Sequence, residues 1–212
     1  TGTNSYGNLI SYVYKSTALG MSPVHNFFLY MVGFYILMLV MGLNHWQSAI
    51  GAISFGLSTY FIIIIGAGHN TKAAAIAYMA PIIAGILLTF RKKYLLGGAI
   101  TALFLALQLR ANHLQITYYL LIILLIYGGF KLYEAFKSKE FPHLLKAVGI
   151  LLFAVLLAVG TNSTKLMLSM QYTKDSTRGK SELTLDTANK TSGLDKDYVT
   201  GWSYGVAESF TL

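Results

Sequence analysis

Uninterrupted apolar runs dominate this sequence. No Asp, Glu, Lys or Arg occurs between Lys15 and Lys72, and this stretch is long enough for two membrane crossings of roughly 20 residues each. The tetrapeptide Gly42-Leu43-Asn44-His45 marks the hairpin between them. Further uncharged runs follow, so we predict six membrane helices, at about residues 22–42, 46–66, 73–90, 94–109, 111–130 and 147–164.

Three details refine these crossings. The run 94–109 is short for a span, so we expect it to continue through Asn112 while Arg110 snorkels toward water. Pro81 removes one intrahelical hydrogen bond and predicts a kink in the third helix. Small residues at four-residue spacing predict close helix contacts, and they are Ser48, Ala52 and Gly56 on the second crossing and Gly98 and Ala102 on the fourth.

The remaining segments are shorter or more polar. Residues 1–21 resemble an amphipathic helix at the membrane interface, which precedes a bundle over residues 22–165. Residues 131–146 are predicted to form a short connector, which Pro142 interrupts before the last span. Residues 166–212 form a polar loop. Because the sequence lacks an initial Met and ends in an apolar-looking stretch, we expect it to be a fragment of a longer protein.

Composition supports a membrane environment. Hydrophobic residues make up 55% of the sequence and charged residues only 11%, whereas a soluble domain carries about 25% charged residues. The absence of Cys excludes disulfides, Cys-ligated metals and thiol nucleophiles. We therefore predict an all-α, polytopic transmembrane bundle with membrane lipid as its partner. The net charge of +8 does not require nucleic acid, because membrane proteins concentrate Lys and Arg in cytoplasmic loops.

The distribution of basic residues predicts an orientation. The connections after the first, third and fifth crossings hold seven basic residues, which are Arg91, Lys92, Lys93, Lys131, Lys137, Lys139 and Lys146. The short segments on the other face hold three: Lys15, Lys72 and Arg110. The positive-inside rule then places residues 91–93 and 131–146 in the cytoplasm. Residues 68–72, 110–115 and 166–212 are extracytoplasmic.

The residues that could bind a ligand lie on the extracytoplasmic face. Three segments there are rich in residues that bind phosphate or a sugar, and the candidate binding residues are His69, Asn70, Lys72, Arg110, Asn112, His113, Gln115 and Arg178. The alternative is that these polar residues merely mark where helices leave the membrane. Two histidines without a third ligand argue against a metal site, and no cofactor motif is present. Asp195-Lys196-Asp197 matches a nucleotide-sugar transferase pattern that is common by chance.

The amino-acid sequences of these segments resemble those of a known family, and the resemblance spans nearly the whole sequence in order. The stretches are Gly66-Ala67-Gly68-His69-Asn70-Thr71-Lys72 with Ala75-Ile76-Ala77-Tyr78-Met79, Arg110-Ala111-Asn112-His113-Leu114-Gln115-Ile116-Thr117-Tyr118-Tyr119, and Ser176-Thr177-Arg178-Gly179 with Gly201-Trp202-Ser203-Tyr204-Gly205. They resemble the YfhO-type bacterial membrane protein family in its Bacteroidota form. That family is several times longer and resembles the GT-C class of polytopic glycosyltransferases.

The resemblance implies a bacterial inner-membrane enzyme that moves a sugar from a polyprenyl-phosphate donor to an envelope acceptor. In the GT-C class the acidic catalytic residue follows a first helix that has no counterpart in this sequence, so no residue here inherits that role. His69, Lys72, Arg110 and His113 would hold the donor phosphate. A lipid-intermediate transporter or flippase, or a non-catalytic membrane component, is the alternative, and the oligomeric state is left open.

Overall fold

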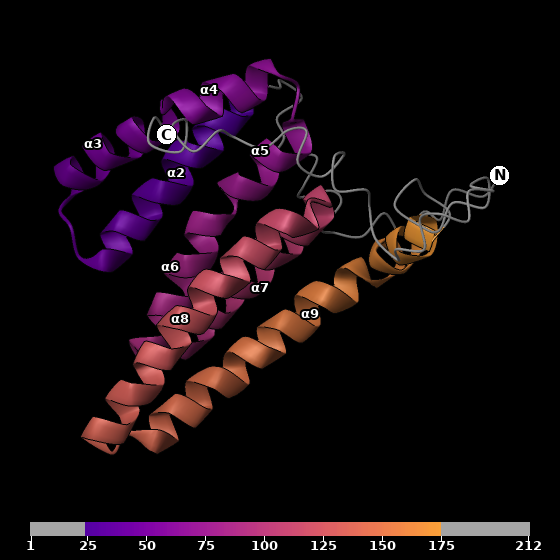
Figure 1. The fold of residues 1–212 in the computed structure, drawn as a ribbon. Helices are drawn as coiled ribbons and strands as arrows, with labels where there is room; N and C mark the ends of the chain where they lie inside the picture. Colours follow the sequence, from indigo (N-terminus) through magenta and orange to yellow (C-terminus); the bar gives the residue numbers. More distant parts are fainter. Residues whose placement is uncertain (1–23, 175–212) are drawn as a thin grey trace, which may run out of the picture. The chain divides into compact units, whose positions relative to one another are not determined.

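The computed structural model describes residues 24–174, and every regular element in this part of the chain is an α-helix (Figure 1). The helices are α2 (Val24–Met41), α3 (His45–Gly56), α4 (Thr59–Gly66), α5 (Asn70–Ala77), α6 (Met79–Phe90), α7 (Tyr94–Ala111), α8 (Leu114–Ser138) and α9 (Phe141–Lys174). The chain divides into two units, Thr1–Ser163 and Thr164–Leu212. All packing described below is within the first. The predicted segment 1–21 and residue Arg178 lie outside the described residues.

The described helices fit a multi-pass integral membrane protein. Five spans are long and apolar enough to cross a membrane: α2, α5 with α6, α7, α8, and α9 as far as Tyr172. The predicted second crossing is not one straight helix, because α3 and α4 are bent by 41° relative to each other. Counting this bent pair as one span gives the predicted six. The bend follows Gly56, and Ser58 adopts the extended backbone of an N-cap residue before α4.

The third crossing has the interruption that Pro81 predicts. The helix breaks at Tyr78, between α5 and α6, because Pro81 has no N–H to donate to the carbonyl of Ala77. Gly33 of α2 packs against this break, where a Cβ atom would lie 3.0 Å from Pro81 Cδ and 3.1 Å from the Ala77 oxygen. The absence of a side chain at Gly33 therefore allows α2 to approach the break.

Helices α6 and α7 make the closest contact in the bundle through small residues on both. A Cβ atom on Gly85 would lie 2.8 Å from the Thr101 amide nitrogen, and one on Gly97 would lie 2.5 Å from the Thr89 amide nitrogen. Both threonine hydroxyls donate back to the carbonyl oxygens of these glycines, at 3.0 and 2.8 Å. The neighbouring Gly98 also makes the close contact that its spacing predicts, but with α9, since a Cβ atom there would lie 2.7 Å from Ile150 Cγ2.

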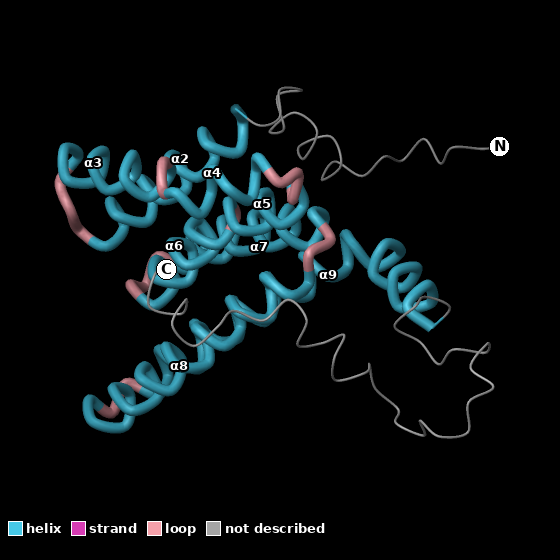
Figure 2. Tube along the Cα trace, turned by 45° about the horizontal axis from the view of Figure 1, so that its top comes forward, coloured by secondary structure: helices cyan, strands magenta, loops and turns pink. Residues whose placement is uncertain are grey.

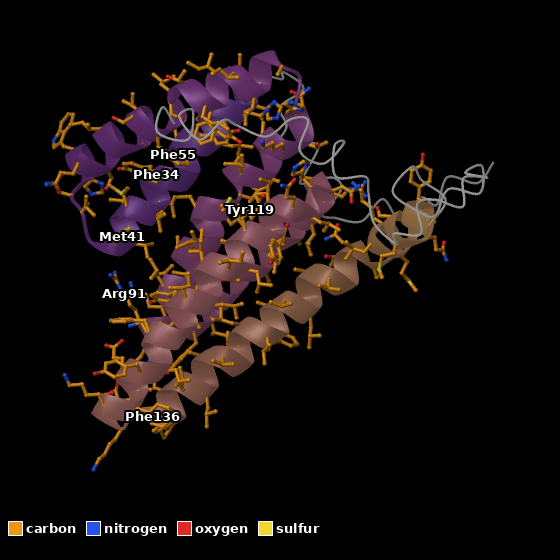
Figure 3. The ribbon with its side chains drawn as sticks, viewed as in Figure 1. Phe34, Met41, Phe55, Arg91, Tyr119 and Phe136 are labelled. Atoms are coloured by element: carbon orange, nitrogen blue, oxygen red, sulfur yellow. The ribbon has the colours of Figure 1, made fainter. Side chains whose placement is uncertain are left out.

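Other small-residue predictions are confirmed on α3. Ser48, Ala52 and Gly56 are buried, and a Cβ atom on Gly56 would lie 2.6 Å from Met31 Cγ on α2. The rings of Phe34 and Phe55 stack between the same two helices, with centroids 4.3 Å apart (Figure 3).

Two predicted boundaries are wrong. Residues 131–146 are not a separate connector, because α8 continues to Ser138 and α9 begins at Phe141 after a short loop (Figure 2). Pro142 lies in the first turn of α9, where its missing N–H costs nothing. Helix α9 also continues to Lys174, so residues 166–174 are helical rather than part of the polar loop. The fourth crossing extends past residue 109 as expected, but α7 ends at Ala111, one residue short of the predicted Asn112, which is its left-handed C-cap residue.

The connections between the helices lie at two opposite ends of the bundle. We call the connections around residues 91–93 and 139–143 the lysine end. Here Arg91 donates to the carbonyl oxygens of Val40 and Met41, which end α2 (Figure 3). Lys92 Nζ lies 3.3 Å from Glu140 Oε1. We call the connections around residues 67–72 and 111–115 the histidine end.

Candidate functional site

Two helices begin at the histidine end, and each has a histidine as its N-cap residue. Helix α5 starts after His69 and α8 starts after His113, and neither histidine side chain makes a capping hydrogen bond. The first backbone N–H groups of a helix have no intrahelical acceptor, and the helix dipole makes this end partially positive. Two such ends therefore offer hydrogen-bond donors and positive potential to an anion.

Buried apolar residues bring these two helix starts together. Ala74 of α5, Ala111 of α7 and Ile116 of α8 belong to one buried cluster. Gln108 of α7 is fully buried, and its Nε2 donates to the Ala75 carbonyl oxygen at 2.9 Å. The ends of α5, α7 and α8 are thus fixed relative to one another by packing and by a hydrogen bond.

The chain reverses direction sharply at both connections because of left-handed backbone conformations. Gly68 has φ +79°, and a Cβ atom there would have no neighbour within 4 Å, so backbone conformation rather than space favours glycine here. Asn112 has φ 59° and ends α7, and Asn tolerates this region better than most residues. These two turns place each histidine at the start of the following helix.

Charge at the histidine end is positive. Lys72 is half-buried, and its Nζ lies 5.3 Å from the centroid of the Tyr60 ring. The pKa of His113 is below its ordinary value, because partial burial disfavours the charged imidazolium and the nearby Lys72 and His69 repel it further. Between residues 24 and 174 the acidic residues are Glu134 and Glu140, and both lie at the lysine end. The described part of the histidine end thus holds no carboxylate.

The structure brings together some of the predicted site residues. His69, Lys72 and His113 interact electrostatically across two connections. Asn70 is the first residue of α5, and Arg110 lies half-buried in the last turn of α7. The remaining predicted residues have other positions. Asn112 is the C-cap residue of α7, and Gln115 donates to the Tyr119 hydroxyl one turn along α8 at 2.6 Å. The sequence also predicts that His69, Arg110 and Arg178 open onto one shared cavity, and this stays a prediction because Arg178 lies outside the described residues.

Three buried polar residues that support this end were missed. They are Gln108, Tyr30, whose hydroxyl donates to the Ala73 carbonyl oxygen at 2.9 Å, and Asn162, whose Nδ2 donates to the Ala106 carbonyl oxygen at 3.0 Å. Each lies inside an apolar run, whereas the prediction considered polar residues at helix ends. An uncharged polar residue within a span was the available signal, since it must find a partner there.

Within residues 24–174, no three His, Asp or Glu side chains lie close enough to hold a metal ion. The histidine end instead brings together a lysine, two histidines and two helix N-termini. No family model, curated protein or solved structure matches this chain.

Proposed function

We propose that the histidine end binds the phosphate of a lipid-linked sugar and forms the donor site of a GT-C-like transferase in the bacterial inner membrane. One observation carries this proposal: the starts of α5 and α8, each with a histidine N-cap, meet beside Lys72.

A phosphate needs both charge and hydrogen-bond donors. Lys72 supplies a point charge, and Arg110 supplies a planar fork that suits two phosphate oxygens. The backbone N–H groups at the starts of α5 and α8 supply further donors without a cost in side-chain entropy. The lowered pKa of His113 favours its neutral form in the free protein, and a bound anion would favour the imidazolium as a third cation beside Lys72 and Arg110.

A lipid-linked donor fits this position better than a soluble one. The outer side of α8 next to the site is apolar and exposed, with Leu114, Tyr118 and Leu121 about half exposed. A polyprenyl chain would lie along these residues in the bilayer while its phosphate reaches the helix starts. The excess of basic residues at the lysine end favours a cytoplasmic placement of that end, so the donor site would be extracytoplasmic.

The described residues would orient the donor and stabilise its leaving phosphate. As the bond between the sugar and the phosphate oxygen breaks, negative charge grows on that oxygen, and preorganised donors lower the barrier. The acceptor hydroxyl must also lose a proton to a base. Within the described residues the histidine end has no carboxylate, so the proposal requires a base from another part of the protein.

A non-catalytic lipid-binding component is the second candidate, and the position of Glu134 and Glu140 at the opposite end favours it. Turnover of a radiolabelled polyprenyl-phosphate sugar by the full-length protein separates the two candidates. The assay compares the parent with Arg110→Ala and, as a control at the lysine end, Lys137→Ala. Turnover that only Arg110→Ala impairs supports the transferase. Saturable donor binding without turnover supports the second candidate, and absence of donor binding refutes both.

A further inference from the structure

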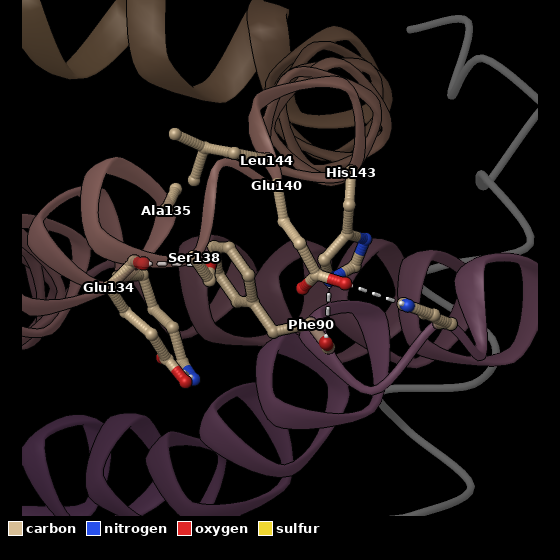
Figure 4. A pocket seen from close by; sticks show the side chains of 9 residues that line it. Phe90, Glu134, Ala135, Ser138, Glu140, His143 and Leu144 are labelled. Carbon is tan, nitrogen blue, oxygen red and sulfur yellow. Dashed lines mark hydrogen bonds and ion pairs between the residues drawn. The ribbon is translucent and has the colours of Figure 1, made fainter.

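A second concave site lies at the lysine end. It is a pocket of about 110 Å³ between the ends of α6 and α8 and the start of α9, and the Phe90 ring, Ala135 and Leu144 line its apolar part (Figure 4). The proposed donor site is at the opposite end of the bundle, so this pocket has no role in that proposal.

The ionic groups in this pocket balance each other. Lys92 Nζ lies 3.3 Å from Glu140 Oε1, and Lys131 Nζ lies 2.6 Å from Glu134 Oε2. All four side chains line the pocket, and Glu134 and Glu140 are on either side of the Phe90 ring in Figure 4. The pocket therefore has no net charge, although the lysine end around it is strongly basic.

His143 lines the pocket, but both of its ring nitrogens already have hydrogen-bond partners. Its Nε2 lies 2.9 Å from the Phe90 carbonyl oxygen, which can only accept a hydrogen bond, so Nε2 carries the proton. Its Nδ1 lies 2.7 Å from the Tyr94 hydroxyl. With both ring nitrogens occupied, His143 leaves the two lysines and two glutamates as the charged groups of the pocket that a ligand can contact.

We propose that this pocket binds the zwitterionic headgroup of a phospholipid with a primary ammonium group, phosphoethanolamine. Its phosphate would contact the lysine of one ion pair, and its ammonium group would contact the glutamate of the other. A simple anion would meet two carboxylates, and a simple cation would meet two ammonium groups. A zwitterion can join both existing ion pairs into one alternating array of charges.

The Lys92–Glu140 ion pair is accessible enough to rearrange around such a headgroup. The side chains of Lys92 and Glu140 are 62% and 54% exposed, and exposed ion pairs add little to stability. Ser138 also lines the pocket, but its hydroxyl already donates to the Glu134 carbonyl oxygen at 2.8 Å. A primary ammonium group has three N–H donors for carboxylates, whereas the quaternary ammonium of a choline headgroup has none.

Residues beside the pocket favour a membrane lipid over a soluble zwitterion. Phe136 and Leu145 neighbour lining residues in sequence and are 62% and 70% exposed, which matches contact with acyl chains. The Phe136 and Phe141 rings pack edge to face with centroids 4.7 Å apart. Aromatic residues are enriched at the level of lipid headgroups.

Native mass spectrometry of the delipidated full chain in detergent tests this proposal. The first lipid adduct is titrated with phosphatidylethanolamine, phosphatidylcholine or phosphatidylglycerol of equal chain length. We expect phosphatidylethanolamine to bind about tenfold more tightly than the other two, because each of them lacks the ammonium donors. Equal adduct formation with all three lipids, or a preference for phosphatidylglycerol, would overturn the proposal.

Paired substitutions localise the site. Lys92→Gln with Lys131→Gln should weaken phosphatidylethanolamine binding about tenfold, and Glu134→Gln with Glu140→Gln should reverse the preference toward phosphatidylglycerol. The control Lys137→Gln with Lys139→Gln, at the same end but outside the pocket lining, should leave the preference unchanged. A preference that survives both pocket pairs overturns the proposal. Full competition by soluble phosphoethanolamine would overturn its assignment to a lipid.

Discussion

The contact between α6 and α7 leads to a quantitative prediction for Gly97→Ala. The added Cβ atom would lie 2.5 Å from the Thr89 amide nitrogen and 2.6 Å from the Gly85 carbonyl oxygen. Both are backbone atoms, so neither can rotate away. Reaching a separation of 3.0 Å, below which real Cβ contacts are essentially not observed, requires the two helices to separate by about 0.5 Å, the difference between 3.0 and 2.5 Å.

Such a separation is costly because the packing is lost along the whole contact. A gap of about 0.5 to 1 Å forfeits a quarter to a half of the dispersion energy of each atom pair, and overpacking costs about 1–3 kcal/mol in measured cases. We expect Gly97→Ala to lower the free energy of unfolding by about 2–3 kcal/mol. In a helix free of such contacts, alanine would instead stabilise by about 0.5–1 kcal/mol.

Gly149→Ala and Gly128→Ala provide matched controls, since a Cβ atom at either position has no neighbour within 4 Å. The free energies of unfolding are measured in mixed detergent–lipid bicelles by titration with a denaturing detergent, for the parent and the three variants. The controls should be neutral or slightly stabilised. If Gly97→Ala is as stable as Gly128→Ala, the close contact between α6 and α7 is refuted.

Three further predictions concern the site and the orientation. Arg110→Ala should weaken donor binding about tenfold to a hundredfold through loss of a charge-assisted hydrogen bond. Arg110→Lys should partly restore binding, and the amount of inserted protein should change little. Equal donor affinity of Arg110→Ala and the parent contradicts the assignment. Lys92→Cys should resist labelling by an impermeant maleimide added to intact spheroplasts and react after lysis, and labelling before lysis reverses the orientation. Because burial, Lys72 and His69 lower the pKa of His113, its contribution to stability is present above its ordinary pKa of about 6.5 and is lost as pH falls through the lowered value. A bound phosphate favours the imidazolium, so donor affinity measured between pH 8 and 5.5 should rise as pH falls, and His113→Gln should remove that rise.

Interruptions of the helices were predictable where a single residue dictates them. Asn44 accepts a hydrogen bond from the Gln47 amide at 2.9 Å and starts α3, as the polar hairpin predicts. Pro81 breaks the third crossing for a reason that holds in any helix. The bend after Gly56 was missed, because an apolar run measures how much chain can lie in a membrane and not whether the helix is continuous.

Tertiary contacts between faces were predictable only in part. Gly97 and Gly98 are adjacent and chemically identical, and they face different helices, α6 and α9. Choosing between them requires the rotation of α7 about its axis, which small-residue spacing does not give. The meeting of His69, Lys72 and His113 was predictable, since successive crossings return the chain to the same end. The position of Gln108 within a span indicated that it needs a partner, but not which one, because that partner is a backbone carbonyl group with no sequence signature.

The partners in the α6–α7 contact are neighbours in the chain, joined by the short connection 91–93. Forming this hairpin costs little loop-closure entropy, and no later segment is needed to complete it. During synthesis, α6 and α7 can therefore pair in the membrane as soon as α7 has left the ribosome, which places Gln108 beside Ala75 before α8 exists. Of His69, Lys72 and His113, His113 is then synthesised last, together with the first turn of α8. A variant that loosens the hairpin should delay biogenesis of the histidine end without altering any residue in it.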